Sequence, residues 1–155
     1  MKLHFFSDHF QGQIESYNID NEQLRFTGHP LECIELSKHN LNRHSIIAIE
    51  NEELVTFFVL HEKEGVIPYS NNPNAILLRA FSTDKYQQGK GYAKQALTLL
   101  PEFVKENFNH INEIVLAVNI QNVVAQGLYN KCGFVDEGVR KEGEKGELII
   151  MSYYL

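Results

Sequence analysis

The sequence predicts an α/β domain of the α+β kind, with strands paired as hairpins in its first half and alternating with helices in its second. Three observations predict this class. Short apolar runs bounded by polar turns recur along the chain. A stretch with apolar residues three and four apart follows a glycine-rich segment in the second half. No linker divides the 155 residues, so we expect one domain over residues 1–155.

The first half of the chain reads as three strands and one helix. Residues 2–6 form a short strand, and Pro30 suits the first turn of a helix that continues over residues 31–40. Residues 45–49 and 54–60 are apolar strands separated by a polar turn, which is typical of an antiparallel hairpin. A segment rich in Pro, Gly and Asn then predicts a loop over residues 62–74.

The second half alternates strands with helices. We expect strand, helix, strand and helix in this order: residues 75–81, 93–108, 114–118 and 123–129. Pro101 should kink the first of these helices or end its regular part, and Gly133 fits the end of the second. Residues 134–139 and 148–154 bracket a polar turn and predict a closing hairpin.

Composition and charge restrict the function classes. Hydrophobic residues make up 43% of the chain and charged residues 22%, as in ordinary globular proteins. The formal net charge of −6 disfavours a nucleic-acid partner, because phosphate contacts supply most of that affinity. No apolar run approaches the roughly 20 residues that span a bilayer, so we expect no membrane partner. The N-terminal residues do not resemble a signal peptide.

The cysteines and histidines predict no metal site. Cys33 and Cys132 lie far apart and show no CxxC spacing. No two of the seven histidines have the spacing of four with a glutamate that is typical of a zinc helix. We therefore expect two buried thiols, no metal ion, and a reducing compartment such as the bacterial cytoplasm.

The segment QQGKGYA, residues 87–93, lies between a buried strand and a helix. Backbone N–H groups at a helix N-terminus bind anions, glycine lets the backbone close around an oxygen, and Lys90 adds a charge. The segment therefore fits a phosphate, although glycines needed only for the turn would give the same pattern. The segment does not match a Walker A loop, because that motif requires glycine at position 84, which is Asp84. It does not match a Rossmann fingerprint either, because Lys94 stands where the third small residue belongs.

A third pattern does fit. Gln88 to Ala93 matches the Q/R-x-x-G-x-G/A signature of the GNAT superfamily of acyl-CoA-dependent N-acyltransferases, and residues 118–134 resemble its second signature. The second match is carried by Asn122, Ala125, Leu128, Tyr129, Lys131, Gly133 and Phe134. The resemblance covers residues 75–135 well, whereas the first half matches only in its order of elements. It implies a mixed, mostly antiparallel central sheet of about six to seven strands, flanked by helices and splayed between two parallel strands.

The resemblance also implies an activity. Such a protein is an N-acetyltransferase that moves an acetyl group from acetyl-CoA to a primary amine of a small molecule or protein, by direct attack in a ternary complex. The glycine loop would hold the pyrophosphate, the pantetheine arm would pair with the strand before it, and Tyr129 would act as general acid. The cofactor-binding residues would be Ala80, Phe81, Gln88, Gly89, Lys90, Gly91, Tyr92, Ala93 and Asn122. Homodimers are common in the family.

Alternatives stay open at several positions. Tyr129 alone would be a core residue with its hydroxyl at the rim, and Asn122 alone would be a helix N-cap. By alternation Arg79 shares a face with Leu77 and Phe81, where a buried arginine needs a partner. Its side chain would form an internal ion pair, reach solvent at the strand end, or bind a carboxylate of the acceptor. No general base is assigned, and a water relay would serve as well. The alternative function is a non-catalytic acyl-CoA-binding or regulatory module with the same fold.

Overall fold

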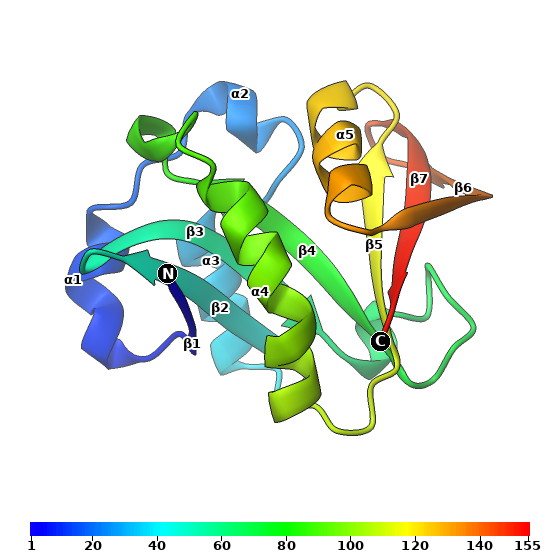
Figure 1. The fold of residues 1–155 in the computed structure, drawn as a ribbon, viewed down its shortest axis with the longest axis horizontal. Helices are drawn as coiled ribbons and strands as arrows, with labels where there is room; N and C mark the ends of the chain where they lie inside the picture. The colour runs from blue at the N-terminus through cyan, green and yellow to red at the C-terminus, as the bar shows by residue number, and fades with distance from the viewer.

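The computed structural model describes the whole chain, from Met1 to Leu155, and its centre is one seven-stranded sheet of order β1-β2-β3-β4-β5-β7-β6 (Figure 1). The strands are β1 Lys2–Phe5, β2 Arg43–Glu50, β3 Glu53–His61, β4 Ala75–Thr83, β5 Glu113–Asn119, β6 Val135–Gly143 and β7 Gly146–Tyr154. The helices are α1 Gln11–Glu15, α2 Asn21–Leu24, α3 Pro30–Lys38, α4 Tyr92–Asn107 and α5 Val123–Lys131. All neighbouring strands are antiparallel except β4 and β5, which are parallel. The predicted mixed, mostly antiparallel sheet is therefore confirmed.

Helices cover both faces of the sheet. Side chains of β2 alternate between the faces, so Ile46 and Ala48 join the core under α4, whereas Ile47 joins the core under α3. Figure 1 shows α4 crossing in front of the sheet and α3 lying behind it. No helix is long and apolar enough to cross a membrane.

The predicted elements are present, with ends shifted by a few residues. The closing hairpin is tighter than predicted, because β6 continues to Gly143 and β7 begins at Gly146. The short helices α1 and α2 were not predicted, since they are too short to show apolar periodicity. A signal for α2 does exist in the sequence: Asp20 and Gln23 form a reciprocal capping box at its start.

Helix α4 continues through Pro101 to Asn107, so of the two predicted effects of this proline, a kink or an end of the helix, the end does not occur. Proline removes one backbone hydrogen bond and crowds the preceding turn. The apolar face of the helix offsets this cost, because Leu97, Leu100 and Val104 are buried in the core on both sides of the proline.

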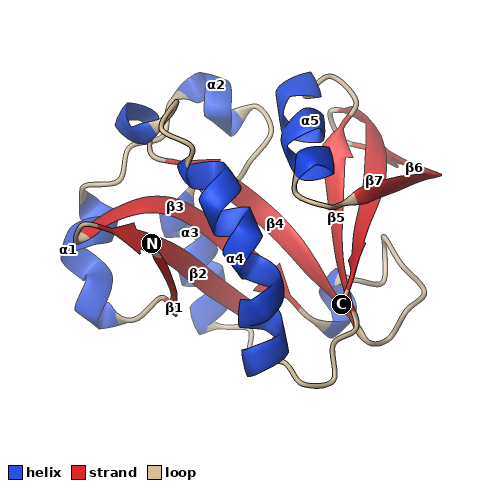
Figure 2. Ribbon diagram, viewed as in Figure 1, coloured by secondary structure: helices blue, strands red, loops and turns tan.

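Strands β4 and β5 are joined over only part of their length. Ala75–Leu78 of β4 pairs in parallel with Glu113–Leu116 of β5, and no pairing follows beyond these residues. Beyond it, Ala80 has a φ of +54°, and the register between β3 and β4 shifts, so β4 carries a bulge. Figure 2 shows the two strands close together near the C-terminus of the chain and apart at their other ends. The predicted splay between two parallel strands is therefore confirmed.

The bulge also changes which side chains share a face. Phe81 packs against Phe58 in the core under α4, at 5.7 Å between ring centroids, whereas Leu77 belongs to a separate cluster on the other face. The prediction that Phe81 shares the face of Leu77 and Arg79 is therefore wrong, because alternation fails where Ala80 takes a left-handed conformation. Arg79 is exposed, which agrees with the alternative of a side chain that reaches solvent.

Candidate active site

Two cavities meet in the opening between β4 and β5. The α4-side cavity, of about 760 Å³, is lined by the loop before α4, the start of α4, α5 and the separated halves of β4 and β5. The α3-side cavity, of about 690 Å³, is lined by α3, the segment before it, β2, β4 and the β6–β7 hairpin. Both cavities are lined by Phe26, Thr27, Leu78, Arg79, Ala80, Ala117 and Asn119. The two cavities therefore adjoin at the splay between β4 and β5.

The glycine loop presents free backbone donors to the α4-side cavity. Gly89 and Gly91 have φ of +79° and +80°, a conformation that side chains disfavour. Gly91 is the N-cap of α4, and no side chain caps this helix. The first-turn N–H groups of α4 are therefore left for an anion. Asp84 anchors the loop below, because its carboxylate accepts from the N–H of Asn18 at 2.7 Å and of Tyr86 at 2.8 Å.

The structure brings nine of the ten residues predicted for the site to the α4-side cavity: Ala80, Phe81, Gln88, Gly89, Gly91, Tyr92, Ala93, Asn122 and Tyr129. Lys90 is the one that does not line it, and its Nζ donates instead to Oε1 of Gln87 at 2.8 Å. The loop geometry thus relies on main-chain donors rather than on this lysine.

Helix α5 is fixed at both ends by local bonds. The Asn122 side chain accepts from the N–H of Ala125 at 3.3 Å, so it caps the helix as well as lining the cavity. At the other end Gly133, with a φ of +96°, donates to the carbonyl of Asn130, and the following N–H donates to the carbonyl of Tyr129. These paired bonds hold the last turn, which carries Tyr129.

Tyr129 sits in an apolar environment that keeps it protonated. Its ring lies edge-on to Phe81 at 6.2 Å and to Phe134 at 5.9 Å between centroids. Burial, with a smaller contribution from Cys132, raises the pKa of the Tyr129 phenol above its ordinary value of 10.0. Its hydroxyl makes no hydrogen bond to another protein group. At neutral pH this side chain is therefore a neutral proton donor without a protein acceptor.

The β6–β7 hairpin closes the α3-side cavity. Lys145 Nζ donates to the carbonyl of Arg25 at 2.7 Å, and Lys141 Nζ donates to that of Pro68 at 2.8 Å. The Asn119 amide of β5 donates to the carbonyl of Lys145 at 3.0 Å. Nothing in the sequence signals the two lysine contacts, because they join segments that lie 73 and 120 residues apart. The cavity walls are therefore a tertiary feature.

Neither cysteine forms a disulfide. Cys33 is buried as expected, whereas Cys132 is partly exposed, which corrects that half of the expectation. No group of three or more His, Cys, Asp or Glu side chains is placed to hold a metal ion.

Comparison with known proteins agrees with this geometry. The model of the acetyltransferase (GNAT) family matches residues 8–134. An uncharacterized N-acetyltransferase of Bacillus subtilis (strain 168), YbbJ, is 38% identical over 156 residues, which cover 100% of this chain and 98% of that protein.

Solved structures share the fold at low sequence identity. Aminoglycoside acetyltransferase AAC(6')-Ib with coenzyme A and kanamycin matches with a TM-score of 0.78 and 16% identity over 98% of this chain and 93% of its own. Spermidine N-acetyltransferase of Vibrio cholerae with coenzyme A and spermine matches with a TM-score of 0.74 and 18% identity over 99% and 94%. With the family model spanning most of its length, the chain belongs to the GNAT acetyltransferase family.

Proposed function

We propose that residues 1–155 form one N-acetyltransferase domain that moves an acetyl group from acetyl-CoA to a primary amine. The observation that carries the proposal is the α4-side cavity, where an uncapped helix N-terminus and a half-buried, neutral tyrosine face one space in the splayed sheet. Membership of the GNAT family and neighbours solved with coenzyme A support the choice of co-substrate.

The donor would occupy the α4-side cavity. The main-chain N–H groups between Gln88 and Ala93 would hold the pyrophosphate, and Asn122 would contact the chain that follows it. The edge of β4 that faces β5 is unpaired beyond Leu78, so the pantetheine amides would add to it like a strand near Ala80 and Phe81. This arrangement would place the thioester in the opening where the two cavities meet.

The amine would approach from the α3-side cavity and attack the thioester carbonyl carbon. A C–N bond forms and the C–S bond breaks, while negative charge develops on the carbonyl oxygen and then on sulfur. Main-chain N–H groups on the free edge of β4 would stabilise the oxygen, and Tyr129 would donate its proton to the leaving thiolate. The amine must shed its own proton. We assign no single base, because the cavity carboxylates of Glu32, Glu142 and Glu144 and a water relay all suit this step.

Thiol release from acetyl-CoA tests the proposal. The assay would use a panel of amines that includes amino acids, spermidine, aminoglycosides and short peptides, with a blank that lacks amine. Kanamycin and spermine, held by the solved neighbours, support an amine as acceptor. Release well above the blank would establish transfer.

The melting temperature would be measured in parallel, with and without acetyl-CoA. A higher melting temperature with a flat panel would favour the alternative, an acyl-CoA-binding or regulatory module. A flat panel with no thermal shift would refute both functions.

A further inference from the structure

Two arginines on the α3 face of the sheet have no carboxylate partner. Arg43 of β2 pairs in register with His61 of β3, which pairs with Leu77 of β4, and Arg79 lies two residues further along β4. Directly opposed residues point to the same face, so Arg43, His61 and Arg79 share it. Both arginines line the α3-side cavity. The other two arginines of the chain each form an ion pair with a carboxylate, whereas these two form none.

Two of the four buried side-chain polar atoms that lack a hydrogen-bond partner belong to residues that line the same cavity. The Nε of Arg43 is buried and has no hydrogen-bond partner, and the same holds for Oγ1 of Thr27, which also lines this cavity. A buried donor without a partner costs free energy, so such atoms are rare in folded proteins. Burial and, to a smaller extent, the neighbouring Arg79 lower the pKa of the Arg43 guanidinium. This part of the cavity wall thus offers polar atoms that no protein group satisfies.

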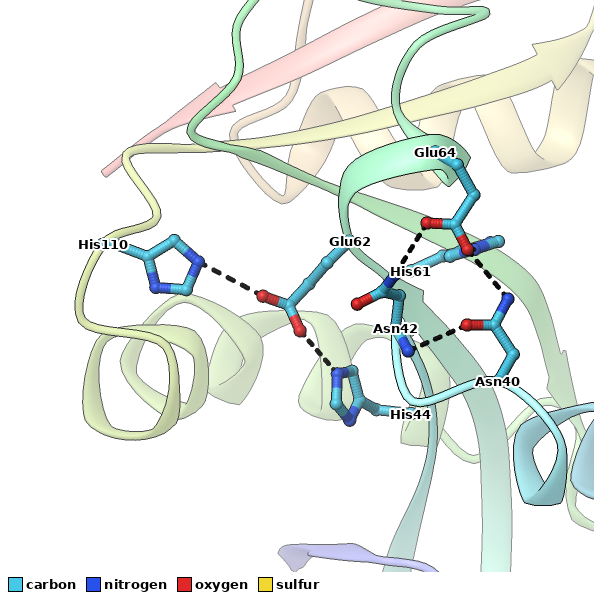
Figure 3. A network of polar contacts seen from close by, with 7 residues as sticks. All are labelled: Asn40, Asn42, His44, His61, Glu62, Glu64 and His110. Carbon is cyan, nitrogen blue, oxygen red and sulfur yellow. Dashed lines mark hydrogen bonds and ion pairs between the residues drawn. The ribbon is translucent and has the colours of Figure 1, made fainter.

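A polar network holds Arg79 toward this cavity. Its Nη1 donates to Nδ1 of His61 at 3.3 Å. Because arginine can only donate, Nδ1 of His61 is the acceptor and the ring proton is on Nε2. This Nε2–H faces Oε1 of Glu64 at 3.3 Å. Glu64 in turn accepts from the side-chain amides of Asn40 and Asn42, both at 2.8 Å (Figure 3). The nearby carboxylate is therefore committed to other donors, and most N–H groups of Arg79 stay available.

We propose that Arg43 and Arg79 bind an oxyanion on the acceptor, so that the acceptor is an amine carrying a carboxylate or phosphate group rather than a polyamine. The inference rests on the proposed function of the same site. Guanidinium groups bind carboxylate and phosphate through paired N–H donors, and an anion between two such groups cancels their repulsion. Arg79 lines both cavities, so a bound oxyanion lies beside the opening where the amine must react.

Matched amines test the substrate class. The first pair is L-lysine and cadaverine, which differ by a carboxylate, and the second is phosphoethanolamine and ethanolamine, which differ by a phosphate. We expect kcat/KM to be about tenfold or more higher for the member that carries the acidic group in at least one pair, and the pair that responds identifies the anion. Equal or better use of cadaverine and ethanolamine, which lack the acidic group, would overturn the inference and leave the proposed transferase intact.

Variants locate the effect. Arg79 is exposed, so Arg79→Gln should fold. It should raise KM about tenfold for the acceptor that carries the acidic group, and leave KM unchanged for the matched amine without that group and for acetyl-CoA. Arg140→Gln removes the same charge from an ion pair with Asp136 that lines neither cavity, and serves as the matched control. Equal effects of the two substitutions would refute a specific anion site.

A binding measurement decides the question without turnover. Inorganic phosphate would be titrated into protein saturated with coenzyme A, with sodium chloride at matched ionic strength as the reference. We expect a saturable rise in melting temperature that is lost in Arg79→Gln and kept in Arg140→Gln. No saturable rise would overturn the inference even if no amine in the panel reacts. A protein that binds phosphate but not coenzyme A would instead refute the proposed function alone.

Discussion

Tyr129→Phe removes one hydroxyl from the α4-side cavity and tests the proposed acid. If Tyr129 protonates the leaving thiolate, its loss should lower kcat by about 10²- to 10⁴-fold, the usual range for a positioned acid. The phenyl ring keeps its edge contacts with Phe81 and Phe134, at 6.2 Å and 5.9 Å. Since the hydroxyl has no protein partner, the free energy of unfolding should change by no more than about 0.5 kcal/mol.

The assay combines thiol release with thermal denaturation. KM for acetyl-CoA and its stabilising effect should persist in Tyr129→Phe, because the glycine loop is untouched. Tyr153→Phe is the matched control: Tyr153 packs on Phe134 in the same aromatic row, at 5.6 Å between centroids, but lines neither cavity, so kcat should not change. Similar kcat in Tyr129→Phe and wild type would refute the role of the acid.

Three further predictions concern stability and the glycine loop. Burial lowers the pKa of His61 below 6.5, so the unfolded state takes up the proton at a higher pH than the folded state. The contribution of His61 to the free energy of unfolding is therefore largest above about pH 6.5 and falls as the pH drops further. Melting temperatures should fall less steeply with pH in His61→Gln than in the exposed control His39→Gln. Gly133→Ala should lower the free energy of unfolding, measured in urea, by about 1–2 kcal/mol, because φ is +96° and the new Cβ would lie 2.9 Å from a tyrosine ring of β7. Gly127→Ala is the control inside α5: its new Cβ has no neighbour within 4 Å, so it should raise the free energy of unfolding by about 0.5–1 kcal/mol. Gly91→Ala should raise KM for acetyl-CoA with little change in kcat, because φ of +80° at the N-cap aims the donors of α4, and an unchanged KM would contradict the phosphate site.

The α4-side cavity could be predicted from the sequence because its determinants are local. The glycines before α4 and the Asn122-to-Gly133 block around α5 each fix a turn or a cap over a few residues. The parallel pairing of β4 and β5 then brings these two segments to one edge of the sheet. Alternation failed only at Ala80, where a left-handed alanine gives no signal in the sequence.

The α3-side cavity could not be predicted in the same way. Its walls come from the segment before α3, from β2 and from the β6–β7 hairpin, which meet only through tertiary contacts such as that of Lys145 with the carbonyl of Arg25. Arg79 did stand out in an apolar strand, but its meaning depended on its partners. The structure removes the ion-pair alternative, since no carboxylate lies within 4 Å of its guanidinium, and adds Arg43, which the sequence did not single out.

The two cavities therefore respond differently to substitution. In the α4-side cavity the proposed ligand would be recognised largely by main-chain groups, so side-chain changes there should act through backbone conformation, as at Gly91. In the α3-side cavity recognition falls to side chains on strands whose pairing does not depend on them, as with Arg79 at the exposed start of the splay. Exchanging Arg79 should thus change which amine is accepted without moving β4, because the bulge at Ala80 and the pairing over Ala75–Leu78 already fix that strand. On this reasoning the choice of acceptor depends on residues of the α3-side cavity, which lie outside the two sequence motifs. A preference for amines that carry a carboxylate or phosphate group that survives Arg79→Gln would show that the reasoning fails.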